Sequence, residues 1–187
     1  MDATDARADL DNDGFNNLEE YEAGSDLTNI EDTPVPIASR APGVWAQYFS
    51  GPNFDQFVMT RLESGLAFNW GYASPVPELP VDNFSARYTT QFTPLHADGA
   101  RSYEVIANAD DGVRVDFDGK RVIDRWGYSR TPNTVQITAN AGQSYPVSVE
   151  YYDGVRNANL SVQFIDTVTG ELQDPAKIFT TLIADYP

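Results

Sequence analysis

The chain has 187 residues, no cysteine and a formal net charge of −16, from 28 acidic and 12 basic side chains. A negative field of this size repels nucleic acid and anionic membrane surfaces, and it attracts cations. Without cysteine the fold must be held without disulfides. No apolar stretch approaches the roughly 20 residues that a membrane-spanning helix needs.

The acidic residues are concentrated at the beginning of the chain. Residues 1–33 contain eleven acidic side chains and one basic side chain. Prolines then recur at Pro34, Pro36 and Pro42. Because proline cannot donate a hydrogen bond within a sheet, residues 34–43 are predicted to form a linker. We therefore expect the acidic segment to be separate from the remainder of the chain.

A twelve-residue pattern in this segment is typical of a calcium-binding loop. Carboxylates stand at positions 1, 3 and 5, glycine at position 6 and glutamate at position 12. Alternate side chains of such a tightly coiled loop point to one centre. The predicted ligands are the side chains of Asp9, Asp11, Asp13 and Glu20 and the backbone carbonyl of Phe15. An acidic tail without a bound ion is the alternative.

The flanking helices are too short for a paired EF-hand. The EF-hand-like loop instead resembles the calcium loops of bacterial thrombospondin type 3-like repeats, because Glu19-Glu20-Tyr21 and Gly24-Ser25-Asp26 follow the aspartates. This resemblance implies a calcium-stiffened spacer between domains. A contribution of Asp26, Asn29 and Asp32 to a further ion is left open.

From Val44 onward, apolar and polar side chains alternate in short runs separated by turn residues. A period of two is typical of half-buried strands. Residues 44–173 are therefore predicted to form an antiparallel β-sandwich, so the fold class is all-β with a short N-terminal calcium loop. Residues 174–187 could be a closing strand or a linker.

Two adjacent carboxylates, Asp110 and Asp111, precede the most regular predicted hairpin, whose turn is Asp118-Gly119. An Asp-Gly pair favours a tight turn because glycine tolerates positive φ. Neighbouring carboxylates repel each other, and a hard cation such as calcium would remove that cost. A solvated loop is the alternative interpretation.

Six landmarks in order resemble the β-sandwich domain of the anthrax protective antigen type, over residues 44–165. They are 45–49, 68–70, 84–88, 102–105, the run 108–126 and 141–152. Members of its lectin subgroup, such as yeast flocculins and bacterial RTX adhesins, hold calcium with a double Asp joined by a cis peptide bond and with a second loop.

The resemblance implies a particular set of site residues. The calcium ligands would be the side chains of Asp110, Asp111 and Asp153 and the carbonyls of Val155 and Asn157. Yeast members carry Asn where Asp153 stands, so this site would have three carboxylates. The sugar-binding residues would be Asp110, Asp111, Arg156, Asn157 and Asn159, whose side chains can hydrogen-bond sugar hydroxyls.

The implied function is a calcium-dependent carbohydrate-binding (lectin) domain of a large secreted or cell-surface bacterial adhesin. Calcium would bridge the protein and vicinal hydroxyls of a cell-surface glycan or polysaccharide. A substrate-targeting module of a secreted glycosidase or protease, and a calcium-rigidified spacer without ligand, are the alternatives. No enzyme is expected, because adjacent carboxylates cannot flank a glycosidic bond at the required separation. No nucleic-acid partner or membrane insertion is expected either.

Overall fold

The computed structural model describes residues 8–12, 15–17, 20–21, 25–32 and 40–182. The chain divides into two compact units, which are considered one at a time. The larger unit comprises residues 42–181, and the smaller one comprises residues 1–41 with 182–186. Within the described residues, no helix is long and apolar enough to cross a membrane.

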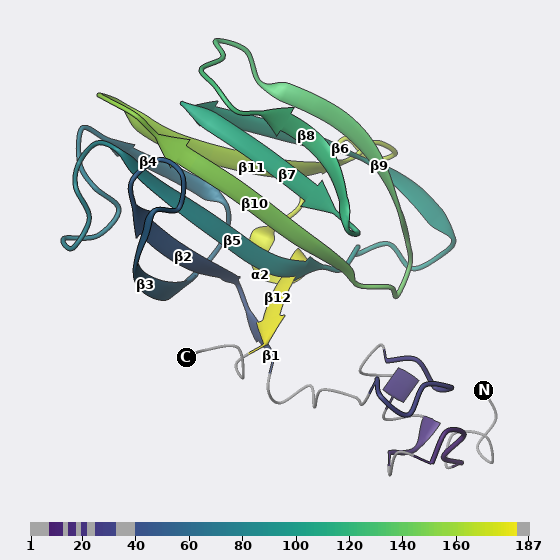
Figure 1. Cartoon of the computed structure of the whole chain (residues 1–187). Coiled ribbons are helices and arrows are strands. Elements are labelled where there is room, and N and C mark those ends of the chain that lie inside the picture. The colour runs from purple at the N-terminus through teal and green to yellow at the C-terminus, as the bar shows by residue number, and fades with distance from the viewer. Residues whose placement is uncertain (1–7, 13–14, 18–19, 22–24, 33–39, 183–187) are drawn as a thin grey trace. The chain divides into compact units, whose positions relative to one another are not determined.

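The larger unit is built almost entirely of strands (Figure 1). The elements are β1 (Arg40–Pro42), β2 (Val44–Ser50), β3 (Gln56–Glu63), β4 (Ala67–Gly71), β5 (Phe84–Phe92), β6 (Ala100–Asp110), β7 (Gly112–Phe117), β8 (Lys120–Arg125), β9 (Asn133–Asn140), β10 (Tyr145–Asp153), β11 (Ala158–Asp166), α2 (Pro175–Ile178) and β12 (Phe179–Leu182).

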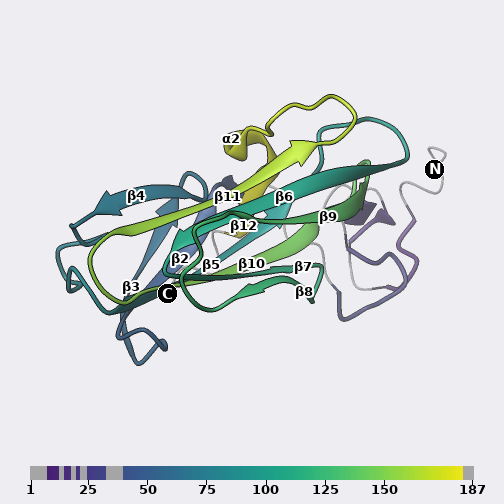
Figure 2. The ribbon, with the colours of Figure 1, turned by 90° about the horizontal axis from the view of Figure 1, so that it is seen from above.

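These strands form two sheets that face each other as a sandwich (Figure 2). In the eight-stranded sheet, β12, β5, β10, β7 and β8 follow one another, β2 and β3 extend from β5, and β1 is the eighth strand. In the four-stranded sheet the order is β4, β11, β6 and β9. The pairings between the named strands are antiparallel, so the predicted all-β antiparallel sandwich is confirmed.

The core lies between the sheets and follows the predicted alternation. Along β5 the side chains of Phe84, Ala86, Tyr88 and Phe92 are fully buried, because a period of two sends every second residue inward. The hairpin of β7 and β8 turns at Asp118-Gly119, where φ is 51° and 70°. Positive φ at both positions matches the tight turn that the Asp-Gly pair predicts.

The chain after β11 closes the eight-stranded sheet. Asp174 caps the single turn of α2 by accepting a hydrogen bond from the Ala176 amide at 3.1 Å. Phe179 in β12 then pairs with Phe92 in β5. The buried hydroxyl of Thr90 lies 2.8 Å from the Gly43 carbonyl oxygen and 3.0 Å from the Thr180 carbonyl oxygen, and these two acceptors share its one proton.

Replacement of Thr90 by valine tests this closure. The change keeps the side-chain shape but leaves buried carbonyls without their donor, so it should reduce the free energy of unfolding by about 1 kcal/mol. Thr89→Val, one residue earlier on the exposed face, is the matched control and should change stability by less than half as much. Urea unfolding of the three proteins measures this, and equal effects of the two changes would contradict it.

Candidate functional site

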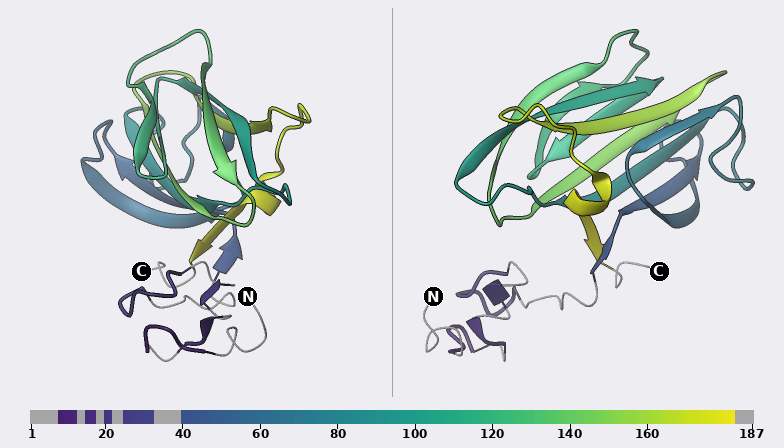
Figure 3. Two further views of the ribbon diagram at one scale, coloured as in Figure 1. Left: turned by 90° about the vertical axis from the view of Figure 1, so that its right-hand side faces the viewer. Right: turned by 180° about the vertical axis from the view of Figure 1, so that it is seen from behind.

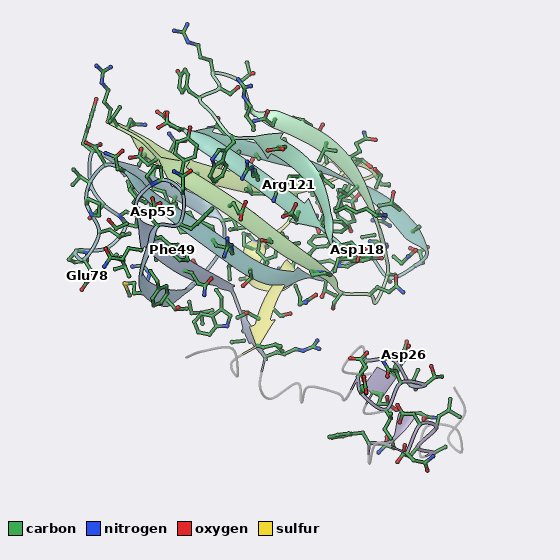
Figure 4. All side chains as sticks on the ribbon, in the orientation of Figure 1. Asp26, Phe49, Asp55, Glu78, Asp118 and Arg121 are labelled. Carbon is green, nitrogen blue, oxygen red and sulfur yellow. The ribbon has the colours of Figure 1, made fainter. Side chains whose placement is uncertain are left out.

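Several loops converge at one end of the sandwich. Asp55 in the β2–β3 connection and Glu78 in the β4–β5 connection lie at this end, whereas Asp118 in the β7–β8 turn lies at the other (Figure 4). Tyr152 in β10 pairs with Gly112 in β7. The register therefore brings the end of β10 and the start of β7 to the end opposite the Asp118 turn.

The double aspartate forms the corner at which the chain passes from β6 in one sheet to β7 in the other. The peptide bond between Asp110 and Asp111 is cis, as expected. The hydroxyl of Tyr151 donates to the Asp110 carbonyl at 2.5 Å, and the Asp111 amide donates to the Tyr152 carbonyl at 3.2 Å. Strand β10 therefore fixes the backbone of both carboxylates.

Two glycines let neighbouring groups approach this corner closely. A Cβ atom at Gly112 would lie 2.2 Å from the Tyr152 ring. The Gly154 amide donates to Asp111 Oδ2 at 2.7 Å, and a Cβ atom at Gly154 would lie 3.0 Å from the same oxygen. The hydrogen bond from the Gly154 amide thus joins the double aspartate to the β10–β11 loop.

Asp153 is the most unusual residue of the site. Its side chain is fully buried, and neither carboxylate oxygen accepts a hydrogen bond from the described residues. Burial raises its pKa to about 7, and the charges of Asp111, Asp82 and Asp110 contribute in the same direction, while the nearby backbone amide of Asn83 acts in the opposite direction. Buried carboxylates are normally paired or hydrogen-bonded, because an isolated charge is costly away from water.

Asp110 lies in the same electrostatic environment. Burial raises its pKa, and the neighbouring charge of Asp111 adds to the increase. A hydrogen bond with the Asn157 side chain favours the ionised form and so opposes the shift. The amide of Asn157 therefore already lies beside one of the candidate ligands.

The β10–β11 loop is held from a distant part of the sequence. Asp82 Oδ1 accepts a hydrogen bond from the Arg156 amide at 2.7 Å, across 74 residues. The Asn83 amide donates to the Gly154 carbonyl at 2.9 Å. Arg156 has a φ of 82°, which turns the chain there. Sequence reasoning missed Asp82 and Asn83, because no spacing links them to the loop that they support.

The predicted ligand set is therefore partly assembled. The charges of Asp111 and Asp110 both raise the pKa of Asp153, so the three side chains lie in one region, and their oxygen atoms are the hard ligands that calcium takes. In the part of the chain that the structure describes, however, no three His, Cys, Asp or Glu side chains form a cluster that would by itself hold a metal ion. A cation here would draw its remaining oxygens from the backbone and from a ligand.

The smaller unit contains part of the predicted N-terminal calcium loop. Asp13 and Gly14 lie outside the described residues. Glu20 is fully buried, while Asp9, Asp11 and Phe15 are partly buried. The Asn17 amide donates to the Ala8 carbonyl at 2.7 Å, and the Leu10 amide donates to Asn17 Oδ1 at 3.1 Å. The chain therefore coils back on itself between its first and last predicted ligands.

The acidic residues that follow make a turn of their own. The Asp26 amide donates to Asp32 Oδ2 at 2.9 Å. Asp26 Oδ1 accepts hydrogen bonds from the Thr28 hydroxyl and amide at 2.8 and 3.1 Å, and these bonds lower the pKa of Asp26. Asn29 Oδ1 accepts from the Glu31 amide at 3.2 Å. These oxygens stabilise the turn.

Three partly buried aromatic side chains, those of Tyr152, Trp126 and Phe54, pack against one another near the corner. The Trp126 ring contacts the Tyr152 ring at 4.8 Å and the Phe54 ring at 5.9 Å between centroids. The guanidinium groups of Arg114 and Arg87 lie 4.2 Å and 4.7 Å from the centroids of Trp126 and Phe54. These contacts show that the rings take part in packing.

Most of the chain matches a known family. The PA14 domain model matches residues 40–176, and the chain belongs to the PA14 domain family. The anti-sigma-I factor RsgI3 of Acetivibrio thermocellus is 32% identical over 123 residues, which are 65% of this chain and 19% of that protein. The chain thus spans about a fifth of the length of this curated relative.

Solved structures of similar proteins share the fold. An anti-sigma factor domain-containing protein from Clostridium clariflavum has a TM-score of 0.66 at 26% identity, covering 73% of this chain and 46% of that one. The epithelial adhesin 9 A domain of Candida glabrata, solved in complex with Galβ1-4GlcNAc, has a TM-score of 0.64 at 13% identity. That match covers 79% of this chain and 93% of the adhesin domain.

Two buried aspartates give a matched test of the site's electrostatics. Burial opposes ionisation of Asp166, but hydrogen bonds from Arg101 at 2.8 Å and from backbone amides outweigh it and lower the pKa. Asp153 has no such donors among the described residues. At pH 8 in chelator, Asp153→Asn should raise the free energy of unfolding by about 1–3 kcal/mol, because it removes an uncompensated buried charge.

The same change at Asp166 should have the opposite sign and cost about 2 kcal/mol, because it removes charge-assisted hydrogen bonds. Urea denaturation of both variants beside the unaltered protein gives the two differences. A loss of stability in Asp153→Asn as large as that in Asp166→Asn would show that Asp153 is satisfied in the folded protein.

Proposed function

We propose that this PA14 domain is a calcium-dependent carbohydrate-binding module, with its site at Asp110, Asp111 and Asp153. The single observation that carries the proposal is the fully buried carboxylate of Asp153, which has no hydrogen-bond donor among the described residues and lies among three further carboxylates. The similar fold of an adhesin domain solved with a disaccharide supports the choice of ligand.

The site residues would have different roles in binding calcium. Bound calcium would compensate the carboxylates of Asp110, Asp111 and Asp153 and offer open coordination positions to two vicinal sugar hydroxyls. The carbonyls of Val155 and Asn157 would supply further oxygens from the loop that Asp82 supports. Because β10 fixes the corner through the Tyr151 hydroxyl and the Tyr152 carbonyl, little ordering is needed when a ligand binds.

Specificity would come from the loop rather than from the carboxylates. Arg156, Asn157 and Asn159 provide hydrogen-bond donors, and the two Asn side chains also provide acceptors. Asn157 already bonds Asp110, so its amide lies where a coordinated sugar would have further hydroxyls. A single sugar unit makes few contacts, so we infer an affinity of about millimolar for a monosaccharide. Repeated copies on a surface would raise it.

The N-terminal loop would bind a second calcium ion with a different role. Its predicted ligands belong to a separate compact unit from the sandwich, so we infer that this ion stiffens a spacer and does not contact sugar. The module would then act as part of a larger secreted or cell-surface protein, which agrees with the small share of RsgI3 that the chain spans.

Calcium titration calorimetry tests the number of ions. The unaltered protein should show two binding events, because it has two separate acidic ligand sets. Asp11→Ala should remove one event and Asp111→Ala the other. Asp98→Ala, whose side chain is 91% exposed, is the control and should keep both. Retention of both events in the two ligand variants would refute both assignments.

A sensor module is the second candidate function. The 32% identity to part of an anti-sigma-I factor favours it, because a glycan-binding domain on such a protein would report a polysaccharide to a regulator instead of attaching a cell to it. The binding chemistry would be the same. The activity of the regulator is measured with the full-length protein before and after a glycan is added. A change in that activity indicates sensing, and no change indicates adhesion.

Glycan binding in calcium and in chelator tests the lectin function itself. Chelator and Asp110→Ala should each abolish binding, because the sugar would depend on the coordinated ion. Deletion of residues 1–33 should leave binding unchanged. The triple change of Arg156, Asn157 and Asn159 to alanine should alter the sugar preference by about tenfold while calcium stays bound. A glycan array, with Asp98→Ala as the control, gives the readout.

Two outcomes would count against a calcium-dependent lectin with a separate spacer. Binding that is equally strong in chelator would show that calcium is not needed. Loss of binding on truncation, with the sandwich still folded by circular dichroism, would show that the N-terminal loop is part of the sugar site.

A further inference from the structure

The outer face of the four-stranded sheet carries polar side chains that the fold does not use. Residues of β11 and β6 alternate between the core and this face, as their burial shows. Outward residues of the sheet include Asn69 on β4, Asn108 on β6, Gln136 on β9 and Asn159, Ser161 and Gln163 on β11. We call these six residues the amide face.

The register places the amide face next to the proposed calcium site. Asn159 lies opposite Asp110 on one side and opposite Asn69 on the other. Ser161 lies opposite Asn108. The polar side chains of the amide face therefore begin beside Asp110, a candidate calcium ligand, and continue along β6 and β11. These two strands run side by side in the view of the sandwich from behind (Figure 3).

The six side chains make no hydrogen bond to another residue in the described part of the chain. They are partly or fully exposed, so water satisfies them in the free protein. Amide groups offer both donors and acceptors, as sugar hydroxyls do. A surface of unused amides can therefore exchange water for a hydroxyl-rich ligand without breaking an internal contact.

The outer face of the other sheet is different, and the contrast identifies the open one. There, Arg87 pairs with Glu150 at 3.1 Å, Arg114 with Asp124 at 3.0 Å and Arg121 with Asp116 at 2.9 Å. Donors and acceptors satisfy one another, so a ligand would have to break ion pairs. Arg121, labelled in Figure 4, belongs to this network.

Charge decides the class of ligand. In a chain of net charge −16, Glu104 is the one charged residue among the outward residues of the four described strands of this sheet, apart from Asp110 at the rim. An anionic polymer would find no positive charge among these outward residues. A protein strand would pair with a sheet edge rather than with a face. A neutral, hydroxyl-rich chain fits best.

We propose that the amide face extends the glycan site, so that the domain binds a neutral linear polysaccharide and not an isolated sugar. This inference rests on the proposed function. One sugar unit lies at the calcium, and the following units run from Asn159 and Asp110 along β6 and β11 toward Glu104. The six residue-to-residue steps of strand from Asp110 to Glu104 extend about 20 Å, which a monosaccharide does not fill.

Calorimetry with a length series of ligands tests this extension. The probes are neutral β-1,4-linked galactose, glucose, mannose and xylose, each from one to six units, in calcium. The test variant combines Asn108→Leu, Gln136→Met and Gln163→Met, which keep side-chain size but remove the amides. The control combines Gln47→Met and Gln91→Met on the outer face of the other sheet.

For at least one sugar series, the unaltered protein should bind the six-unit ligand about tenfold or more tightly than the monosaccharide, because several hydrogen bonds add to the contact with calcium. The test variant should lose this gain and keep the monosaccharide affinity, while the control keeps both. Thermal melting checks that each protein is folded. Should the triple variant unfold, Asn108→Ala with Gln163→Ala replaces it, and half or more of the gain should disappear.

The outcomes separate the extension from the function on which it rests. Calcium-dependent binding with no gain from length, or a gain that the test variant keeps, overturns the extension and leaves the calcium site standing. A gain that survives chelator but needs the amides supports the extended face and overturns the role of calcium. Absence of binding to every probe overturns both.

Discussion

The site depends on one constraint, which is a carboxylate placed in the core without a hydrogen-bond donor among the described residues. Asp153 ends β10, the strand that pairs with both β5 and β7 in the middle of the larger sheet. Its inward direction follows from the same alternation that buries Tyr151 and Val149. The strand therefore cannot turn this side chain toward water without losing its register. The cost of the buried charge is then relieved either by protonation, as the raised pKa indicates, or by a bound cation.

The frame around this charge is stiff, and the parts that would contact ligand are not part of the frame. The Tyr151 hydroxyl and the Tyr152 carbonyl of β10 hold the Asp110-Asp111 corner, and Asp82 holds the Arg156 amide from another connection. The side chains of Val155 and Arg156 remain exposed. Residues on such a loop can change without disturbing the sandwich, so the same carboxylates can serve domains with different ligands.

Much of the fold could be predicted from the sequence, because one face of each strand is buried and the period of two is strong there. Asp118-Gly119 set the hairpin, and the family resemblance supplied the cis bond between Asp110 and Asp111. The role of Asp82 could not be predicted, since its partner is 74 residues away and a single aspartate in a connection carries no pattern. The lack of hydrogen-bond donors around Asp153 could not be predicted either, because the hydrogen bonding of a buried side chain depends on all of its neighbours in space.

The two outer faces of the sandwich differ in how their polar side chains are satisfied, and this difference bears on which glycans can bind. Ion pairs on the eight-stranded sheet use their charges internally, whereas the amides and hydroxyl of the amide face have no internal partner among the described residues. The negative net charge of the molecule disfavours acidic polymers at long range. Calcium at the corner would attract hydroxyl groups only at contact distance. Selection between glycans would thus begin with exclusion of charged chains and end with the hydrogen bonds that a neutral chain makes along the sheet.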